Sequence, residues 1–161
     1  LVLKNNENVI NDKNLTINID FENLSKKTIY SDESAIKRIL QNILETSIKL
    51  TDVGSITIKA DHPEMEIVEK CGAKIVSPAE SRSYIRIAIS DTGMGLAESE
   101  LEGIFEPYTQ LDKSNKKTIV RSITLGIAYT ILKRMGGAIW VESEVMKGST
   151  FYIIIPLEKE I

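Results

Sequence analysis

The sequence is poor in the residues that build disulfides and metal centres. It contains one cysteine, Cys71, and one histidine, His62. A single cysteine cannot form an internal disulfide, so nothing in the sequence indicates an oxidising compartment. One thiol and one distant imidazole also make a poor metal site. Cysteine chemistry and a protein-built metal centre are therefore not expected.

Long apolar runs and an excess of positive charge are absent as well. No apolar run approaches the roughly 18 residues of a membrane span, and Leu1 begins no signal peptide. A formal net charge of −3 argues against a general nucleic-acid binder, which would be basic. The 161 residues, 42% of them apolar and 27% charged, predict one soluble globular domain with a real core. The start without methionine suggests a fragment whose parent could be membrane-anchored.

Hydrophobic periodicity predicts the order of the elements. Alternation of apolar and polar residues predicts strands at 15–21, 55–60, 84–90, 138–144 and 149–157. Helical spacing or composition predicts helices at 31–50, 97–105 and 124–135. Residues 61–83 are predicted to be a surface insertion, whose apolar pieces MEIV and AKIV could form a hairpin, and 106–123 a long basic loop. This order predicts an α+β fold, a two-layer sandwich whose mixed sheet carries helices on one face.

The helix at 31–50 has the clearest pattern. Ser31 and Asp32 supply capping oxygens at its start. Its predicted buried stripe consists of Ile36, Ile39, Leu40, Ile43 and Leu50. Asn42, Thr46 and Lys49 stand at i, i+4 and i+7, so they are predicted to share a face roughly opposite that stripe.

A strand ends in an aspartate between small residues at ISDTGMGL, 89–96. Taken alone, Asp91 could be an Asx turn after a strand. Three further motifs follow it in order: IFEPYTQLD, a helix opening at SITLGIA, and MGGAIWVESEVMKGSTFYIIIPL. Together they resemble the catalytic and ATP-binding domain of sensor histidine kinases, which share the Bergerat fold with the gyrase, Hsp90 and MutL ATPases. The resemblance covers nearly the whole chain from about residue 15, apart from 61–83.

The resemblance implies an adenine site around Asp91. The matching aspartate accepts a hydrogen bond from the exocyclic amine of adenine. A carboxylate can only accept, so it selects this amine over the carbonyl of guanine. Gly93 and Gly95 are expected to let the base approach the backbone. Thr150 matches a threonine that helps to fix the aspartate and a bridging water.

The helix at 31–50 matches the N box of the family, with one departure. The resemblance implies that Asn42 holds Mg²⁺ and that Lys49 reaches a phosphate. A second family asparagine is replaced by Thr46, whose hydroxyl is a weaker neutral ligand than an amide oxygen. The alternative is a polar helix face with nothing bound.

The segment SITLGIA, 122–128, matches the second glycine box of the family but departs further from the family pattern. Ser122 and Thr124 replace two glycines, while Leu125 and Gly126 remain at the expected phosphate site. We therefore expect a weakened triphosphate site or a different lid conformation. The resemblance also places Tyr108, with Phe105, in an aromatic box at the base of the ATP lid. The lid is predicted to be basic through Lys113, Lys116, Lys117 and Arg121.

The function implied is that of a catalytic domain of a two-component sensor kinase, with ATP and Mg²⁺ as cofactors. Such domains donate the γ-phosphate to a histidine on a separate dimerisation domain. A response regulator receiver domain is a further implied partner. No catalytic acceptor is predicted here, since His62 lacks the flanking residues of an acceptor box. Residues 1–14 are expected to be a leading segment after the dimerisation domain, and 15–161 the ATP-binding domain of a homodimeric parent.

Two alternatives stay open on the residues. Thr46, Ser122 and Thr124 are also compatible with a degenerate kinase domain that docks partners with weak or no ATP turnover. A gyrase-like or Hsp90-like ATPase would need a glutamate base four residues before the metal asparagine. Position 42 is asparagine, which argues against hydrolysis by water.

Overall fold

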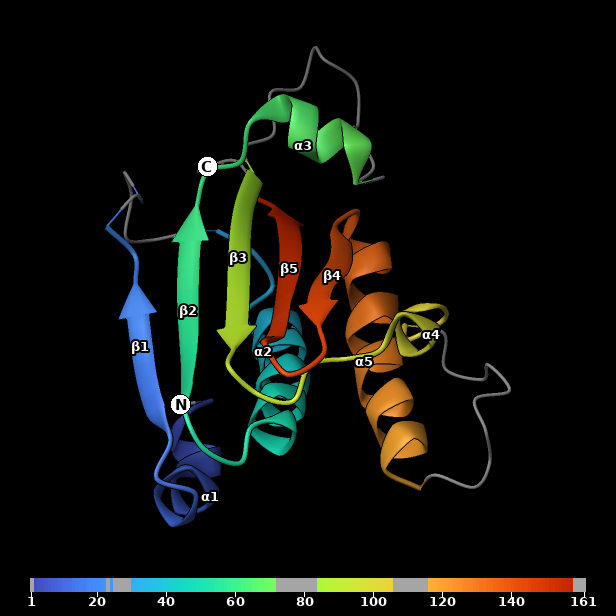
Figure 1. The fold of residues 1–161 in the computed structure, drawn as a ribbon. Helices are drawn as coiled ribbons and strands as arrows, with labels where there is room; N and C mark the ends of the chain where they lie inside the picture. Colours follow the sequence, from blue (N-terminus) through green and yellow to red (C-terminus); the bar gives the residue numbers. More distant parts are fainter. Residues whose placement is uncertain (1, 23, 25–29, 72–83, 106–115, 158–161) are drawn as a thin grey trace.

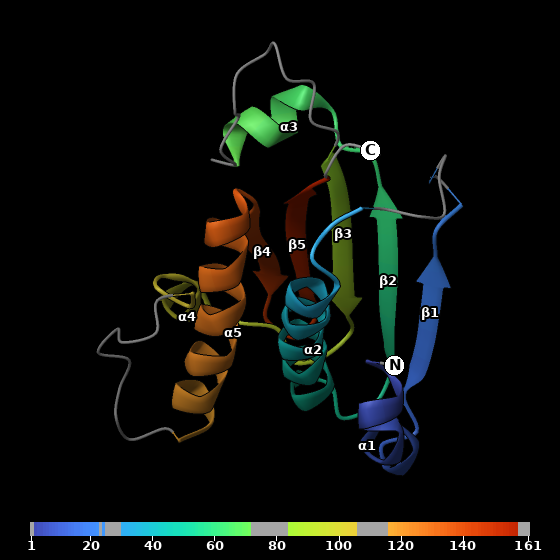
Figure 2. The ribbon, with the colours of Figure 1, turned by 180° about the vertical axis from the view of Figure 1, so that it is seen from behind.

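The computed structural model describes residues 2–22, 24, 30–71, 84–105 and 116–157, with the backbone alone over 116–122. Figures 1 and 2 show two layers, a five-stranded sheet and the helices α2 (Glu33–Leu50) and α5 (Lys116–Met135) against one of its faces. The predicted α+β two-layer sandwich with helices on one face is confirmed.

The sheet is mixed, as the sequence predicts. Its strands are β1 (Thr16–Asp20), β2 (Ser55–Asp61), β3 (Tyr84–Asp91), β4 (Ala138–Glu144) and β5 (Gly148–Pro156). They lie in the order β1-β2-β3-β5-β4, with β1 parallel to β2 and every other neighbouring pair antiparallel. Each predicted strand is confirmed to within one residue at either end. The last residue of β3, Asp91, therefore lies near the start of both β2 and β5.

The core lies between the sheet and the two long helices. Alternation along β3 turns Ile85, Ile87 and Ile89 toward the helices, and all three are buried. They pack in one cluster with residues from α2, α5 and β5, including Ile39, Ile43, Leu125, Leu132, Phe151 and Ile153. Burial of these side chains at about 1.5–3 kcal/mol each is the main stabilising contribution to the fold.

Helix α5 begins earlier than predicted. Residues 116–123 belong to this helix and not to the loop predicted at 106–123. The segment KKTIVRSI contains neither glycine nor proline, so nothing in it ends a helix that packs on α2. The predicted helix at 97–105 is shorter, with α4 spanning Glu98–Leu101. Within the described ranges, no helix is both long and apolar enough to cross a membrane.

The segment MEIV forms a helix and not the predicted hairpin strand. It opens α3 (Met65–Lys70), which lies at one end of the sheet (Figure 1). Val68 is fully buried, in a small second cluster with Tyr84, Ala138 and Ile154 on the sheet face away from α2. The helical spacing of Ile67, Val68 and Cys71 provides this contact. The other piece, AKIV, lies outside the described residues.

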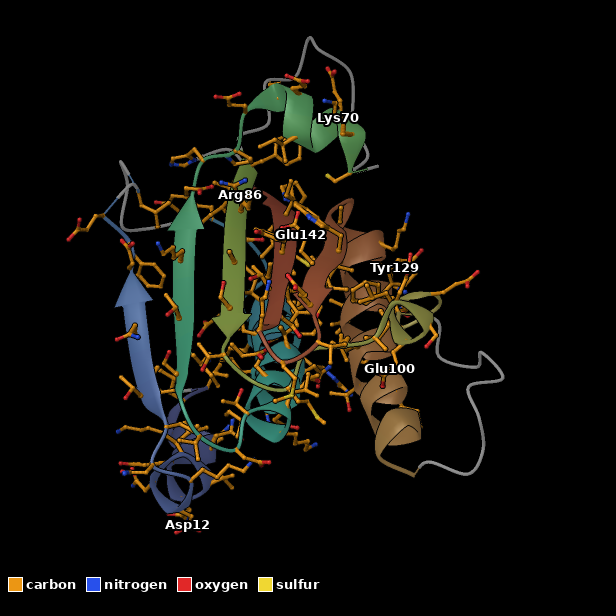
Figure 3. All side chains as sticks on the ribbon, in the orientation of Figure 1. Asp12, Lys70, Arg86, Glu100, Tyr129 and Glu142 are labelled. Carbon is orange, nitrogen blue, oxygen red and sulfur yellow. The ribbon has the colours of Figure 1, made fainter. Side chains whose placement is uncertain are left out.

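Polar side chains are paired on that outer face. Arg86 of β3, labelled in Figure 3, donates to both carboxylate oxygens of Asp61, at 2.9 and 2.7 Å. The Tyr152 hydroxyl donates to Glu142 at 3.1 Å, and its ring stacks on Trp140 with centroids 4.9 Å apart. These contacts pair the polar side chains of Arg86, Asp61, Tyr152 and Glu142 with one another.

Both ends of α2 are capped by side chains. Asp32 accepts from the N–H of Ala35 at 2.9 Å, as predicted for a capping residue. At the other end Lys13, which follows helix α1 (Glu7–Asp12), donates to the carbonyls of Ile48 and Thr51, each at 2.9 Å. A cation is favourable at this negative end of the helix dipole. The segment before β1, which begins with the short 3₁₀ helix η1 (Lys4–Asn6), is thereby tied to α2.

Lys13→Ala is expected to lower the free energy of unfolding by about 1–2 kcal/mol, because two helix carbonyls lose a charged donor. Urea unfolding at neutral pH measures this loss. Lys37→Ala is the matched control, since Lys37 pairs with Glu33 across one exposed turn of the same helix. That control should cost less than about 0.5 kcal/mol. Equal losses in the two variants would contradict a capping role for Lys13.

Candidate nucleotide site

Asp91 is a buried carboxylate with one oxygen bonded and one left open. The residue is 5% exposed. Its Oδ1 accepts hydrogen bonds from the N–H of Gly93 at 3.0 Å and of Ser149 at 3.3 Å. Its Oδ2 is buried and has no hydrogen-bond partner among the described residues. Such an acceptor costs free energy, so Oδ2 marks a position where a donor from a ligand is expected.

Burial raises the pKa of the Asp91 carboxyl above its ordinary value of 3.8, because the charged form is removed from water. The N–H groups of Gly93 and Ser149, and then the nearby hydroxyl of Ser47, lower this pKa by smaller amounts. The contact with Ser47 is not a complete hydrogen bond, since Ser47 Oγ has no partner of standard geometry among the described residues. The groups that favour the ionised form of Asp91 are therefore uncharged hydrogen-bond donors.

Gly93 and Gly95 hold the loop after β3 against two other backbone segments. A β-carbon at Gly93 would strike the carbonyl of Leu50 at the end of α2. One at Gly95 would strike the carbonyl of Glu144 at the end of β4, and the φ of +67° at Gly95 disfavours any side chain. In the structure these glycines thus permit the close packing that fixes Asp91. Their approach to a base stays a prediction.

The prediction that Thr150 fixes Asp91 is wrong. Side chains alternate along β5, and the Thr150 hydroxyl donates to Ser90 at 3.0 Å on the outer face of the sheet. Ser149 is the residue paired with Asp91, and its N–H bonds the carboxylate. Its hydroxyl lies 2.8 Å from that of Ser143. Strand register would have identified Ser149, because directly paired residues share a face.

The three predicted N box residues do not share one solvent face. Lys49 is exposed, but Thr46 is 3% exposed and donates its hydroxyl to the backbone carbonyl of Asn42 at 2.9 Å. The Asn42 side chain is half-buried, and its Nδ2 has no partner among the described residues. The prediction is therefore wrong for Thr46, because α2 packs both on the sheet and on α5.

Ser47 is a residue of this site that the sequence analysis missed. It is fully buried on α2, near the carboxyl of Asp91. It stands four residues after Ile43 and three before Leu50, within the apolar stripe. A hydroxyl at a stripe position needs a polar partner, so its position was the available signal.

The residues present fit Mg²⁺ only as a phosphate-bound ion. No group of three or more His, Cys, Asp or Glu side chains that could hold a metal occurs among the described residues. Asn42 Oδ1 is an amide oxygen at the matching N box position of α2, while the Thr46 hydroxyl is engaged with the backbone. Magnesium keeps several waters and takes other ligands from phosphates. Asn42 therefore fits as a single protein ligand.

Helix α5 runs through the second glycine box and does not begin at it. It starts at Lys116, so the amides of Leu125 and Gly126 lie inside the helix. Leu125 is 0% exposed and belongs to the core. The prediction that Leu125 and Gly126 offer phosphate a helix N-terminus is therefore wrong in this structure. Ser122 and Thr124 supply the physical reason, because both continue a helix more readily than glycine.

The aromatic box is described in part. The ring of Phe105 stacks on that of Tyr129, which Figure 3 labels on α5, with centroids 6.3 Å apart. The segment after α4 thus begins against α5. Outside the described residues lie Tyr108 and Lys113, and also the side chains of Lys116, Lys117 and Arg121.

A polar depression of about 330 Å³ adjoins Asp91 on the side of the β4–β5 hairpin. Purine-sized ligands occupy sites lined mostly by apolar groups, whereas the lining of this depression is mostly polar. The base is therefore expected on the α2 side of Asp91. The depression is lined by Asp91, Glu142, Ser143, Glu144, Lys147, Gly148, Ser149 and Thr150.

Comparison with known proteins points to one family. The family model described as histidine kinase-, DNA gyrase B-, and HSP90-like ATPase matches residues 31–159. The autoinducer 2 sensor kinase/phosphatase LuxQ of Vibrio vulnificus (strain YJ016) is 34% identical over 133 residues, which is 81% of this chain and 14% of that protein. The adaptive-response sensory kinase SasA of Prochlorococcus marinus (strain MIT 9303) is 27% identical over 147 residues, 91% of this chain and 35% of that protein. The chain thus spans well under half the length of these curated relatives.

Solved structures share the fold. Full-length ShkA in complex with AMPPNP superposes with a TM-score of 0.73 at 23% identity, over 99% of this chain and 29% of that one. The nucleotide-free catalytic domain of the histidine kinase ThkA gives a TM-score of 0.69 at 21% identity, over 96% of this chain and 86% of that one. At these identities the similarity establishes the architecture.

Proposed function

Because this chain belongs to the histidine kinase-, DNA gyrase B-, and HSP90-like ATPase family, we propose that it binds ATP as the catalytic domain of a two-component sensor kinase. It donates the γ-phosphoryl group to a histidine on a separate dimerisation domain. The observation that carries the proposal is the buried Asp91 at the end of β3, whose Oδ2 has no partner among the described residues. The family predicted from the motifs is confirmed.

Asp91 recognises the base through its charge state. An ionised carboxylate only accepts, so Oδ2 takes an N–H from the exocyclic amine of adenine. Guanine presents a carbonyl at that position, and two acceptors facing each other in a buried site repel. The N–H groups of Gly93 and Ser149 hold Oδ1, which leaves Oδ2 free for the base. Selectivity for adenine over guanine follows.

The phosphates extend along α2 toward Lys49, whose exposed ammonium adds positive charge. Asn42 Oδ1 is the protein ligand proposed for Mg²⁺. When bound, the ion would neutralise the charge that develops on the phosphates during phosphoryl transfer. The contribution of the chain itself is to position the nucleotide.

The acceptor histidine lies outside this domain. His62 follows the last residue of β2, whereas Asp91 lies beside the first residues of that strand. A strand of this length separates them by about 20 Å. His62 Nδ1 also lies 3.1 Å from the carbonyl of Tyr84. A phosphoryl group bound near Asp91 and α2 therefore has to pass to another domain.

The surrounding architecture follows from this assignment. Residues 1–14 are the leading segment that connects to a dimerisation domain, and 15–161 form the ATP-binding domain with an insertion at 61–83. The partners are that dimerisation domain and a response regulator receiver domain. The parent is a homodimer whose catalytic domains lie in the cytoplasm.

Titration of the domain with a fluorescent ATP analogue, with and without Mg²⁺, tests nucleotide binding. We expect saturable binding that unlabelled ATP displaces and GTP does not, and that Mg²⁺ tightens. Incubation with radiolabelled ATP and a separate dimerisation domain then tests phosphoryl transfer to histidine. Absence of binding at millimolar ATP would overturn the proposal and leave a docking module.

Restoring the family residues at positions 46, 122 and 124 should strengthen the binding of Mg²⁺ and phosphate. In Thr46→Asn with Ser122→Gly and Thr124→Gly, an amide replaces the hydroxyl bonded to the carbonyl of Asn42, and the glycines weaken α5 at the box. We expect the Kd for Mg-ATP to fall about tenfold, equivalent to about 1.4 kcal/mol. Isothermal titration calorimetry with Mg-ATP measures the change.

Thr130→Asn is the matched control for the threonine change. The Thr130 hydroxyl donates to the carbonyl of Gly126 at 2.8 Å, one turn back, as that of Thr46 does to Asn42. It lies on α5 away from Asp91, so this control should leave the Kd unchanged. Level or weaker binding in the triple variant would show that these residues do not limit the site.

A further inference from the structure

Three buried side-chain atoms lack a hydrogen-bond partner in the described part of the chain. Asn42 Nδ2, Ser47 Oγ and Asp91 Oδ2 are buried without a hydrogen-bond partner. All three belong to the candidate nucleotide site. A buried group of this kind costs about 1–3 kcal/mol, so such atoms are rare without a reason. Two of them are complementary, because the hydroxyl can donate and the carboxylate can only accept.

Helix and strand geometry bring Ser47 and Asp91 to the same layer. Ser47 follows Ile43 by one turn of α2, and Ile43 lies in the core shared with β3. Asp91 follows Ile89 by two residues, so it occupies the face of β3 that the helices cover. Ser47 is 0% exposed and Asp91 5%. The hydroxyl lies close enough to lower the pKa of the carboxyl.

We propose that Ser47 is a positioning residue for purine recognition, which donates its hydroxyl hydrogen to Asp91 Oδ2 and holds the carboxylate as the acceptor for the amino group of the base. The inference rests on the proposed function. A carboxylate oxygen accepts two hydrogen bonds, so Ser47 and the amine can share Oδ2. Rotation about the Cα–Cβ bond of Ser47 is the movement that completes the bond.

No charged side chain among the described residues stabilises the ionised form of Asp91. From the loop after β3 and from β5 it receives the N–H groups of Gly93 and Ser149, and from α2 it faces the hydroxyl of Ser47. No charged side chain of the described residues contributes to the shift in its pKa. Ser47 is therefore the one side chain of α2 that favours the ionised form.

Charged side chains line the other side of the carboxyl. Glu142 and Glu144 of β4 and Lys147 of the hairpin line the depression beside Asp91. Lys147 pairs with Glu144 at 2.6 Å, and Glu142 accepts from the hydroxyl of Tyr152. These groups are engaged with one another at the surface, so they do not replace the donor on α2.

Loss of the hydroxyl should change how binding depends on pH. Adenine donates through its amine, so a protonated Asp91 would set a donor against a donor. Burial already raises the pKa of Asp91. Without Ser47 that pKa rises further, and the pH below which binding fails moves upward. A purely structural serine would leave this midpoint in place.

The experiment is a titration of the domain with the fluorescent ATP analogue at a series of pH values from acid to neutral, because the raised pKa of Asp91 places its titration on the acid side. In Ser47→Ala we expect binding about tenfold weaker at neutral pH, the equivalent of one charged hydrogen bond, and a midpoint at higher pH. Ser90→Ala is the matched control. It removes a hydroxyl next to Asp91 in sequence but on the outer face, so its profile should match that of the wild type.

The outcomes separate the two proposals. Wild-type binding with an unchanged profile in Ser47→Ala would overturn the role of Ser47 and leave the proposed function standing. Absence of binding by the wild type and Ser90→Ala at every pH would overturn the proposed function itself. Ser47→Cys keeps a side chain of similar size with a weaker donor, so its midpoint should lie between those of serine and alanine. This variant tests the proposal even where alanine disturbs packing, as circular dichroism would show.

Discussion

Replacing Asp91 with alanine is expected to abolish ATP binding while the sheet and helices stay folded. The substitution removes the acceptor for the exocyclic amine and leaves that donor unpaired in a buried site. Sites built to hydrogen-bond a ligand lose at least about a hundredfold in affinity when one partner is missing. The measurement is a titration with the fluorescent ATP analogue, with circular dichroism to follow the fold.

Glu142→Gln is the control for loss of negative charge. Glu142 lines the depression on the hairpin side of Asp91, but it lies on the outer face of the sheet. Its neutralisation should leave the affinity for ATP within about twofold, since charges at exposed positions interact weakly. Unchanged affinity in Asp91→Ala would mean that the base binds elsewhere.

The same carboxylate should lower the stability of the free domain. The pKa of Asp91 is raised in the folded state, so the fold favours the protonated form. The stabilisation from that form is complete at low pH and is lost as the pH rises through the folded pKa. Asp91→Asn stays neutral, so thermal unfolding should show a higher Tm than the wild type at neutral pH. The difference should vanish in acid, and a pH-independent difference would contradict this assignment.

Local periodicity accounts for most of the fold. The strands follow from alternation because each has one face on the core, as Ile85, Ile87 and Ile89 show on β3. The start of α2 follows from its capping residue, Asp32. These signals act within a few residues along the chain, so a sequence contains them in full.

The elements that the sequence mispredicted are set by distant contacts. Val68 makes α3 a helix by burial against Tyr84 and Ile154, from β3 and β5. Helix α5 packs on α2, and this contact between distant segments adds to the local effect of Ser122 and Thr124, which continue the helix through the second glycine box. Neither contact is visible from spacing alone, since both depend on which segments meet across the fold.

Some features of the site likewise follow from a local motif, and others depend on contacts between distant segments. Asp91 and its glycines are recognisable from a short motif, yet the reason for Gly93 and Gly95 is contact with Leu50 and Glu144. The place of Ser149, in preference to Thr150, depends on the register between β3 and β5.

Gly148→Ala is expected to be more destabilising than Lys13→Ala. Gly148 opens β5 with φ +107°, a conformation that a side chain strongly disfavours. A β-carbon there would also strike the carbonyl of Asp91 and approach Thr92 Cα to 3.0 Å. The atoms it meets are backbone at the end of β3, which cannot move without breaking the pairing of β3 with β5. We expect a loss of about 3 kcal/mol or more in the free energy of unfolding.

Urea unfolding measures that loss, and Met146→Gly in the same hairpin is its matched control. Met146 has φ +65° but is 80% exposed. Its replacement should change stability by less than about 1 kcal/mol, because relief of the left-handed strain and the added backbone freedom of glycine offset each other. Displacement of β5 in Gly148→Ala also withdraws the N–H of Ser149 from Asp91, so ATP binding should weaken in the molecules that still fold. A Gly148→Ala variant as stable as the wild type would show that the start of β5 can shift without disturbing Asp91, and that the backbone contact between them does not hold the carboxylate in place.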